Sequence, residues 1–369
     1  MSPIQHQPQL PTAHTPMWTD PQRQALFETW FQGLLTPHQL DPGSLRLASA
    51  DASFRRYLRV DTHAPHQEAS LIIMDAPPER ENCKPFVQVA QLMAQAGLKV
   101  PDVLAWDEAH GFMLLTDLGA HTLMQVINPQ DPPPLGRYLE AVDVLVQWQL
   151  ASREGVLPVY DAPTLLRELE LFPHWYIGEH RQVTLDIAQR KTLDDAFAKI
   201  VANNLAWPSV YVHRDFMPRN LMVSVEDASA GSHKLGVLDF QDAMYGPITY
   251  DIASLMRDAF LSWDEDFCLD VTIRYWEKAR KAGLPVGDDF GEFYRAVEWM
   301  GLQRHLKVAG VFARLTLRDG KPRYLADTPR FIDYIRATCS RYMELKPLLR
   351  LVERVEGIPV PTAYAFGRT

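Results

Sequence analysis

Short runs of alternating apolar and polar residues dominate the first third of the chain, and they predict a small sheet. Alternation favours strands at residues 45–50, 54–60, 70–74, 103–106 and 112–116, the first three as an antiparallel meander. A helix ended by Gly97 is expected between the third and fourth strands, over residues 84–96. Asp20 followed by Pro21 is a typical helix start, so a further helix is expected at residues 21–35.

Helical periodicity dominates the rest of the chain. Helices begin at about residues 136–152, after the Pro132-Pro-Pro134 linker, and two short strands near 210–212 and 234–238 interrupt them. This pattern predicts an α+β protein with a disordered tail at residues 1–16, a small β-rich lobe at 17–118 and a large helical lobe at 119–369.

Composition narrows the class of protein. A net charge of −9 and a pI near 5.7 give no basic field for nucleic acid or an anionic membrane surface. Three cysteines without metal-type spacing are typical of a reducing compartment, and no apolar run reaches the ~20 residues that span a bilayer. The first sixteen residues lack the apolar segment of a signal peptide. We therefore expect a cytoplasmic protein that does not bind nucleic acid or membrane, and a monomer.

The stretch Tyr211-Val-His-Arg-Asp-Phe-Met-Pro-Arg-Asn220 carries the first part of a candidate active site. Its β-forming residues predict a short strand that delivers His213 to a loop, where hydrogen bonds from its ring would anchor the chain. Asp215 is then placed to orient an acceptor hydroxyl and accept its proton. Asn220 offers a neutral oxygen ligand of the kind that Mg²⁺ takes.

The second part is Gly236-Val-Leu-Asp-Phe-Gln-Asp242, a strand that ends in carboxylates. Asp239 is suited to bridge Mg²⁺ to the β- and γ-phosphates of ATP, where charge must be neutralised during transfer. Asp242 is a further candidate ligand of metal, water or substrate. Each aspartate taken singly could be a surface residue capping a turn. Their combined order and spacing are those of protein-kinase-like folds, and they predict ATP-dependent phosphoryl transfer.

The nucleotide-binding residues are less clearly marked. Neither a P-loop nor a Gly-x-Gly-x-x-Gly is present, so Ser53 in the first strand turn is the candidate phosphate contact, with an ordinary polar hairpin as the alternative. The main chain of Thr116, Asp117 and Leu118 would bind adenine at the hinge between the lobes.

A phosphate-clamping lysine is missing from the third strand. Met74 stands at its expected place, so a positive charge must come from elsewhere. Arg55, Arg56 and Arg59 on the second strand are the nearest candidates, and Lys84 is a more remote one. Alternation puts Arg55 and Arg59 on one face and Arg56 on the other, and the pattern does not say which face meets ATP.

With these residues assembled, the chain resembles the aminoglycoside phosphotransferase and choline kinase-like family. The match runs from about residue 45 to beyond Asp251, and it includes Gly246-Pro-Ile-Thr-Tyr-Asp251 after the two catalytic segments. The resemblance implies a protein-kinase-like bilobal fold with ATP in the cleft and Mg²⁺ on Asn220 and Asp239. It also implies that Asp251, at the start of the next helix, braces the catalytic loop.

Finer features resemble the bacterial anomeric sugar kinases of cell-wall recycling. They are Asp51-Ala-Ser-Phe-Arg-Arg-Tyr57, Ile73-Met-Asp-Ala-Pro-Pro78, Glu168-Leu-Glu-Leu-Phe172 and Leu238-Asp-Phe-Gln-Asp-Ala-Met-Tyr-Gly-Pro247. The resemblance implies phosphorylation of N-acetylmuramate and N-acetylglucosamine at the anomeric hydroxyl during peptidoglycan recycling. It also implies that a sugar-1-phosphate nucleotidyltransferase consumes the product.

Candidate substrate ligands follow from the chemistry of an acidic amino sugar. Arg304, with Lys307 and Arg314 near the same helix face, would suit a carboxylate, and a solvated basic face is the alternative. Glu168 and Glu170 would bind sugar hydroxyls unless they face solvent. Trp175, like Tyr176 and Trp299, would provide an aromatic platform unless it belongs to the core.

Two other functions stay open on the sequence. The first is a kinase for an aminoglycoside or another amino alcohol, which would want an acidic pocket. The second is a nucleotide-binding pseudokinase, which the missing glycine loop and lysine favour. The intact set of Asp215, Asn220 and Asp239 argues against the pseudokinase, because a scaffold has no physical need for a base and two metal ligands.

Overall fold

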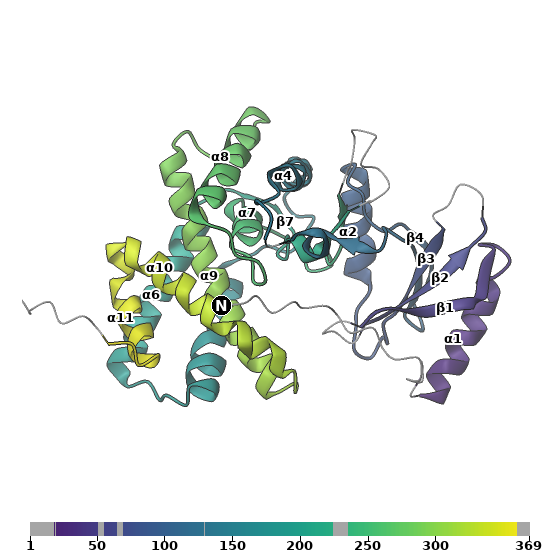
Figure 1. The fold of residues 1–369 in the computed structure, drawn as a ribbon, viewed down its shortest axis with the longest axis horizontal. Coiled ribbons are helices and arrows are strands. Elements are labelled where there is room, and N and C mark those ends of the chain that lie inside the picture. The colour runs from purple at the N-terminus through teal and green to yellow at the C-terminus, as the bar shows by residue number, and fades with distance from the viewer. Residues whose placement is uncertain are drawn as a thin grey trace, which may run out of the picture. The chain divides into compact units, whose positions relative to one another are not determined.

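A computed structural model describes Trp18 and residues 20–50, 55–64, 69–128, 130–223 and 235–359. The described residues form two compact units (Figure 1). The first comprises those up to Gln88 together with Pro101–Leu118, and the second comprises Val89–Val100 and those from Gly119 onward. The predicted tail at residues 1–16 and the predicted phosphate contact Ser53 lie outside the described residues.

The first unit is built on a five-stranded antiparallel sheet with the strand order β1-β2-β3-β5-β4. Its strands are β1 (Leu40–Ala50), β2 (Arg56–Thr62), β3 (Ser70–Asp75), β4 (Val103–Asp107) and β5 (Phe112–Thr116). The prediction of five antiparallel strands in this lobe is thereby confirmed. Strand β1 begins five residues earlier than predicted. The Pro-Gly pair near its start interrupts the alternation, but a register shift between Asp41 and Arg46 keeps this pair within the strand.

Helix α1 (Pro21–Leu34) covers one face of this sheet (Figure 1). It starts as predicted, with the Asp20 carboxylate accepting the N–H of Gln22 at 2.9 Å. Alternating residues of the strands point at this helix, and together they make one apolar core: Phe27, Phe31, Leu40, Leu58, Val60, Leu71, Ile73, Phe112 and Leu114. Helix α2 (Lys84–Gln95) is followed by Gly97 with a φ of 76°, as a glycine C-cap requires.

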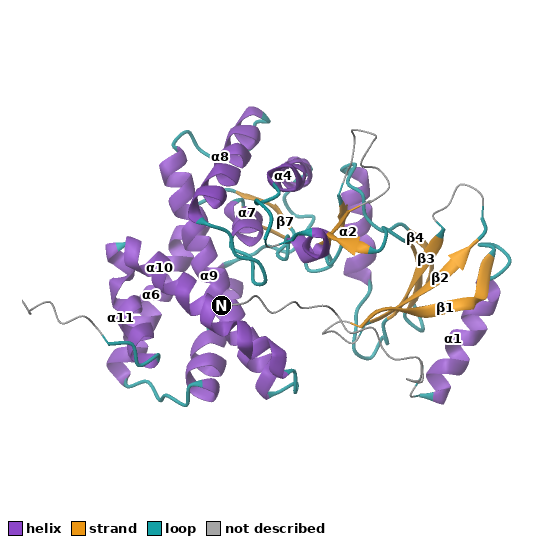
Figure 2. Cartoon of the chain, in the orientation of Figure 1, coloured by secondary structure: helices purple, strands orange, loops and turns teal. Residues whose placement is uncertain are grey.

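The second unit is mainly helical, as Figure 2 shows. Its helices are α3 (Leu123–Val126), α4 (Leu135–Leu150), α5 (Ala162–Leu169), the π-helix η1 (Phe172–His180), α6 (Ile187–Leu205), the 3₁₀ turn η2 (Pro218–Asn220), α7 (Thr249–Met256), α8 (Glu265–Lys281), α9 (Phe290–Leu317), η4 (Pro322–Asp327), α10 (Thr328–Arg341), η5 (Met343–Leu345) and α11 (Lys346–Val355). The 28-residue α9 is mostly buried and packs against α6, α7, α10 and η1.

Five short strands, three more than predicted, lie in the described part of the second unit. They are β6 (His121–Thr122), β7 (Ser209–Val212), β8 (Leu221–Val223), β9 (Gly236–Val237) and β10 (Met244–Pro247). β7 pairs with β10, and β8 pairs with β6 and β9. Strands of two to four residues carry too little alternation to be recognised singly, so β6, β8 and β10 were not predicted.

No helix among the described residues is both long and apolar enough to cross a bilayer.

Candidate active site

The loop after β7 is held by one buried carboxylate. The main-chain N–H groups of His213 and Arg214 donate to the two oxygens of Asp251, at 2.7 and 2.9 Å. Asp251 lies in the first turn of α7, and burial raises its pKa above the usual value. Arg214 has a φ of 78°, which residues other than glycine rarely adopt. These bonds therefore hold a strained turn directly before Asp215.

The ring of His213 joins this loop to the one after β9. Its Nε2 donates to the carbonyl of Leu238 at 2.9 Å, and its Nδ1 accepts the N–H of Asp215 at 3.2 Å. Burial lowers the pKa of His213, so the ring stays neutral, as this pair of bonds requires. With both nitrogens occupied by the main chain, His213 acts as an anchor.

Asp215, Asn220 and Asp239 come together at the junction of these loops. The Nδ2 of Asn220 donates to the main-chain carbonyl of Asp215 at 2.8 Å and to Oδ2 of Asp239 at 3.3 Å. Gln241 donates to the other oxygen of Asp239 at 2.9 Å. Asp239 has a φ of 62°, a second strained position for a residue with a side chain.

Asn220 and Asp239 provide oxygen donors that fit a hard divalent cation. Both side-chain hydrogen bonds of Asn220 use its amide nitrogen. The side-chain amide oxygen has no hydrogen-bond partner among the described residues. An amide oxygen beside a carboxylate is a ligand set typical of Mg²⁺, which retains several waters. The described residues contain no group of three or more His, Cys, Asp or Glu side chains that could hold a metal ion, so this pair is the candidate.

Asp215 combines an accessible carboxylate with strongly cationic surroundings. Its side chain is 41% exposed, and one oxygen lies 3.9 Å from a guanidinium nitrogen of Arg304. Burial by itself would raise the pKa of Asp215, but the charges of Lys307, Arg304 and Arg214 outweigh it and hold this pKa below the usual value. The carboxylate is therefore ionised at neutral pH.

Three cations, Arg214, Arg304 and Lys307, form what we call the cationic group beside Asp215. Glu168, near the end of α5, contacts two of them. It accepts hydrogen bonds from a guanidinium nitrogen of Arg214, from Nζ of Lys307 at 3.0 Å and from the hydroxyl of Tyr160. Burial would raise the pKa of Glu168, yet Lys307 and Arg214 keep it below the usual value. Glu168 therefore binds protein cations in this structure, and its contact with sugar hydroxyls stays a prediction.

Gly246 is needed for the position of Tyr160. A Cβ atom at Gly246 would lie 2.7 Å from the Cβ of Tyr160, closer than real Cβ contacts permit. Only glycine on β10 lets Tyr160 approach and reach Glu168.

Arg304 belongs to the structure of the loop. It is 3% exposed, donates to the main-chain carbonyl of Arg214, and stacks over the ring of Tyr250 with 4.9 Å between guanidinium carbon and ring centroid. Lys307 lies one turn further along α9 and is also largely buried. The alternative of a solvated basic face is therefore wrong for these two residues.

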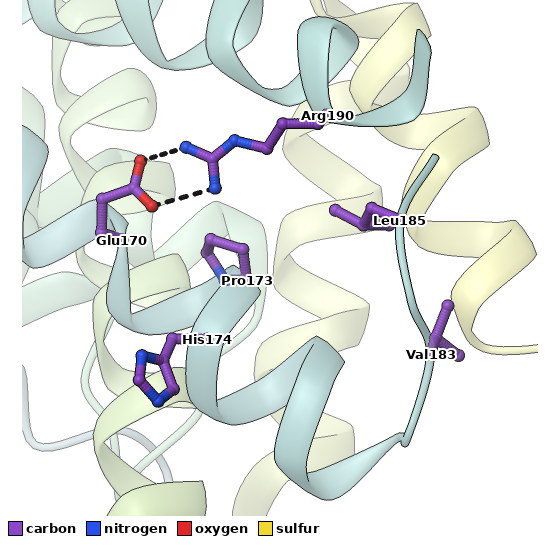
Figure 3. A pocket seen from close by; sticks show the side chains of 6 residues that line it. All are labelled: Glu170, Pro173, His174, Val183, Leu185 and Arg190. Atoms are coloured by element: carbon purple, nitrogen blue, oxygen red, sulfur yellow. Dashed lines mark hydrogen bonds and ion pairs between the residues drawn. The ribbon is translucent and has the colours of Figure 1, made fainter. Parts of the chain in front are cut away.

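Glu170 and Trp175 lie apart from this group. Glu170 is paired with Arg190, with a nitrogen–oxygen distance of 3.0 Å in one of two hydrogen bonds. Figure 3 shows both side chains at a separate pocket of about 380 Å³ lined by Glu170, Pro173, His174, Val183, Leu185 and Arg190. Trp175 stacks on His174 with ring centroids 4.9 Å apart. Asp242 is exposed, and it is its carbonyl that accepts from Arg214, at 3.3 Å.

The predicted nucleotide contacts of the first unit make other bonds in this structure. Arg56 lies on the face of α1, paired with Asp75 at 2.6 Å, whereas Met74 points to the opposite face of the sheet. The Thr116 N–H donates to Asp102, and the buried carboxylate of Asp117 accepts from Arg59 at 2.6 Å. Leu118 is half-buried at the end of this unit.

Three residues around Glu168 were not predicted as site residues: Tyr160, Arg214 and Tyr250. Arg214 stands inside the His-Arg-Asp triplet, so a local signal existed for it, and Lys307 was predicted beside Arg304 as a cation for a carboxylate. The tyrosines come from distant segments with no local signal of this role.

The sequence model of the phosphotransferase enzyme family matches residues 44–290, more than half of the 369-residue chain. The chain belongs to this family. An N-acetylmuramate/N-acetylglucosamine kinase of Neisseria meningitidis serogroup B is 46% identical over 94% of this chain and 100% of the relative. A kinase of the same name from Pseudomonas putida is 45% identical over 92% of this chain and 95% of the relative. The predicted family resemblance is confirmed.

Solved structures of other kinases and phosphotransferases share the fold. A Plasmodium vivax ethanolamine kinase matches with a TM-score of 0.55 at 10% identity, covering 80% of this chain and 83% of that chain. An ADP-bound aminoglycoside phosphotransferase matches with a TM-score of 0.54 at 14% identity, covering 82% and 96%. The predicted protein-kinase-like α+β fold is confirmed.

Proposed function

We propose that this protein is an ATP-dependent kinase that phosphorylates the anomeric hydroxyl of N-acetylmuramate and N-acetylglucosamine. The observation that carries the proposal is the convergence of Asp215, Asn220 and Asp239 in one site. The chain that holds this site is 46% identical, over 94% of its length, to a kinase named for these two sugars.

Asp215 is the residue that acts on the acceptor hydroxyl. Its ionised carboxylate, exposed beside the loop junction, orients the sugar hydroxyl and accepts its proton late in the transfer. An anomeric hydroxyl is more acidic than other sugar hydroxyls, so a weak base suffices and positioning carries most of the catalysis. The bonds from His213 and Asp251 to the surrounding main chain fix where the carboxylate stands.

Asn220 and Asp239 hold the nucleotide side through Mg²⁺. When bound, this ion neutralises the charge that develops on the β- and γ-phosphates of ATP. Gln241 fixes one oxygen of Asp239, and Asn220 contacts the other, so the carboxylate is already oriented.

The pathway position follows from the product. A sugar 1-phosphate is the ordinary substrate of a nucleotidyltransferase, and we place both reactions in peptidoglycan recycling in the cytoplasm. The three cysteines, all buried with free thiols, suit that reducing compartment.

The two alternative functions fit the site less well. A polycationic aminoglycoside would favour an acidic pocket, whereas Arg214, Arg304 and Lys307 surround Asp215 with positive charge. A pseudokinase would not need the oriented metal-ligand pair.

ATP consumption measured with N-acetylmuramate, N-acetylglucosamine, a kanamycin-type aminoglycoside and choline tests the proposal. We expect turnover with the two amino sugars, and a ³¹P NMR signal of an anomeric phosphate in each product. Phosphorylation of the aminoglycoside or choline alone would overturn the proposed acceptor, and no turnover with any acceptor would favour the pseudokinase.

A further inference from the structure

The cationic group beside Asp215 is buried together with the carboxylates that it pairs with. Arg214 and Lys307 both donate to the same oxygen of Glu168, and Arg304 approaches Asp215 and interacts electrostatically with the buried Asp251 and Asp258. All three cations are largely buried, with exposed side-chain fractions of 18% for Arg214, 16% for Lys307 and 3% for Arg304. A buried charged group is stable only where its polar atoms find partners.

Lys307 is the member of the group that can take up an additional anion. An ammonium group has three N–H donors. Lys307 uses one for Glu168 at 3.0 Å and points another at the Tyr250 hydroxyl at 3.5 Å, and no further partner lies among the described residues. Arg304, in contrast, is committed to the Arg214 carbonyl and is almost inaccessible.

The position of Lys307 favours the acceptor over the nucleotide as the source of the anion. The metal ligands Asn220 and Asp239 belong to the loops that follow Asp215, and Mg²⁺ held there would compensate the phosphates. Lys307 lies on α9 and Glu168 on α5. They are linked to Arg214, the residue before Asp215, because Arg214 and Lys307 both donate to Glu168.

We propose that Lys307 binds the carboxylate of an acidic sugar acceptor and so determines the preference for that acceptor over its neutral counterpart. This inference rests on the proposed function. N-acetylmuramate carries a lactyl carboxylate on C3, two ring carbons from the anomeric C1, whereas N-acetylglucosamine has a hydroxyl at C3. With the C1 hydroxyl on Asp215, a carboxylate on the C3 side of the ring is within reach of a neighbouring ammonium group.

The test compares kcat/KM for the two sugars in the wild-type protein and in Lys307→Gln. Glutamine can still donate to Glu168 but lacks the charge. Loss of the Lys307 charge also raises the pKa of Asp215 with either sugar, so the readout is the ratio of the two kcat/KM values, taken at a pH well above that pKa. We expect the ratio of N-acetylmuramate to N-acetylglucosamine to fall about tenfold or more, the usual loss for one charge-assisted hydrogen bond. Lys281→Gln is the matched control, because Lys281 is an exposed lysine of α8 and its loss changes net charge equally. An equal loss with both sugars would overturn the inference.

A second comparison needs no variant. Wild-type protein is assayed with N-acetylmuramate and with its lactyl carboxamide, which has the same shape without the charge. We expect about a tenfold or greater preference for the acid, reduced in Lys307→Gln. Equal rates with acid and amide in the wild-type protein would refute the subsite, even if Lys307→Gln failed to fold. If the wild-type protein phosphorylates neither sugar, the proposed function itself fails, which is a distinct result.

Discussion

A guanidinium nitrogen of Arg304 lies 3.9 Å from a carboxylate oxygen of Asp215, and the same side chain donates to the carbonyl of Arg214. One buried residue of α9 thus both supports the strained turn before Asp215 and, together with Lys307 and Arg214, lowers the pKa of the Asp215 carboxylate. The connection matters for catalysis because Asp215 accepts a proton only in its ionised form.

Arg304→Gln should therefore change the pH dependence of the reaction. The pKa of Asp215 is held low by neighbouring cations, so removal of one of them raises it. The base then stays protonated up to a higher pH, and the acid limb of the kcat/KM profile moves to higher pH. Profiles of wild-type and variant protein, measured alongside thermal unfolding, check this. An unchanged acid limb in a folded variant would show that Arg304 only supports the main chain.

Asp215→Asn should separate chemistry from nucleotide binding. The amide cannot accept the acceptor proton, so kcat is expected to fall about 100-fold to 10,000-fold. Affinity for MgATP, measured by calorimetric titration, should be nearly unchanged, because Asn220 and Asp239 are untouched. A fully active Asp215→Asn protein would remove this residue from the mechanism.

Asp239→Ala, in contrast, should weaken the binding of MgATP. Loss of this ligand is expected to weaken binding of MgATP by about tenfold or more, the scale of one charge-assisted contact. Titration of ATP with and without Mg²⁺ measures the effect, and the gain in affinity that Mg²⁺ gives the wild-type protein should disappear. Normal binding of MgATP would show that the metal assignment is wrong.

Asp258 provides a prediction for stability. It is 1% exposed, one oxygen accepts the N–H of Phe260, and the other has no hydrogen-bond partner in the described part of the chain. Burial raises the pKa of Asp258 to about 6, against the attraction of Arg304 and Arg219. Because the folded state favours the protonated form, this residue reduces stability as pH rises from about 4 to 6.

Asp258→Asn removes that titration. At pH 7 the variant should be more stable than the wild-type protein by about 2–3 kcal/mol, since each pKa unit corresponds to about 1.4 kcal/mol. At pH 4 the difference should be small. Urea unfolding at several pH values measures both, and parallel stability curves for the two proteins would contradict the prediction.

Local sequence signals predicted the elements that depend on local physics. The capping of α1 by Asp20, the five strands of the first sheet and Gly97 after α2 follow from alternation and turn chemistry within a few residues. The short strands β6, β8 and β10 were not predicted, because strands of two to four residues carry little alternation. The spacing of Asp215, Asn220 and Asp239 likewise predicted a convergence that the structure shows.

The sequence by itself thus determined the class of reaction, because the proposed base and metal ligands lie on loops whose order and spacing are fixed along the chain. Only the tertiary structure decided what surrounds the base. Glu168 comes from α5, whereas Arg304 and Lys307 come from α9, far later in the sequence. Whether a charged side chain meets solvent or another charge depends on packing between those helices. No periodicity distinguishes these outcomes, since a basic helix face has the same pattern buried or exposed.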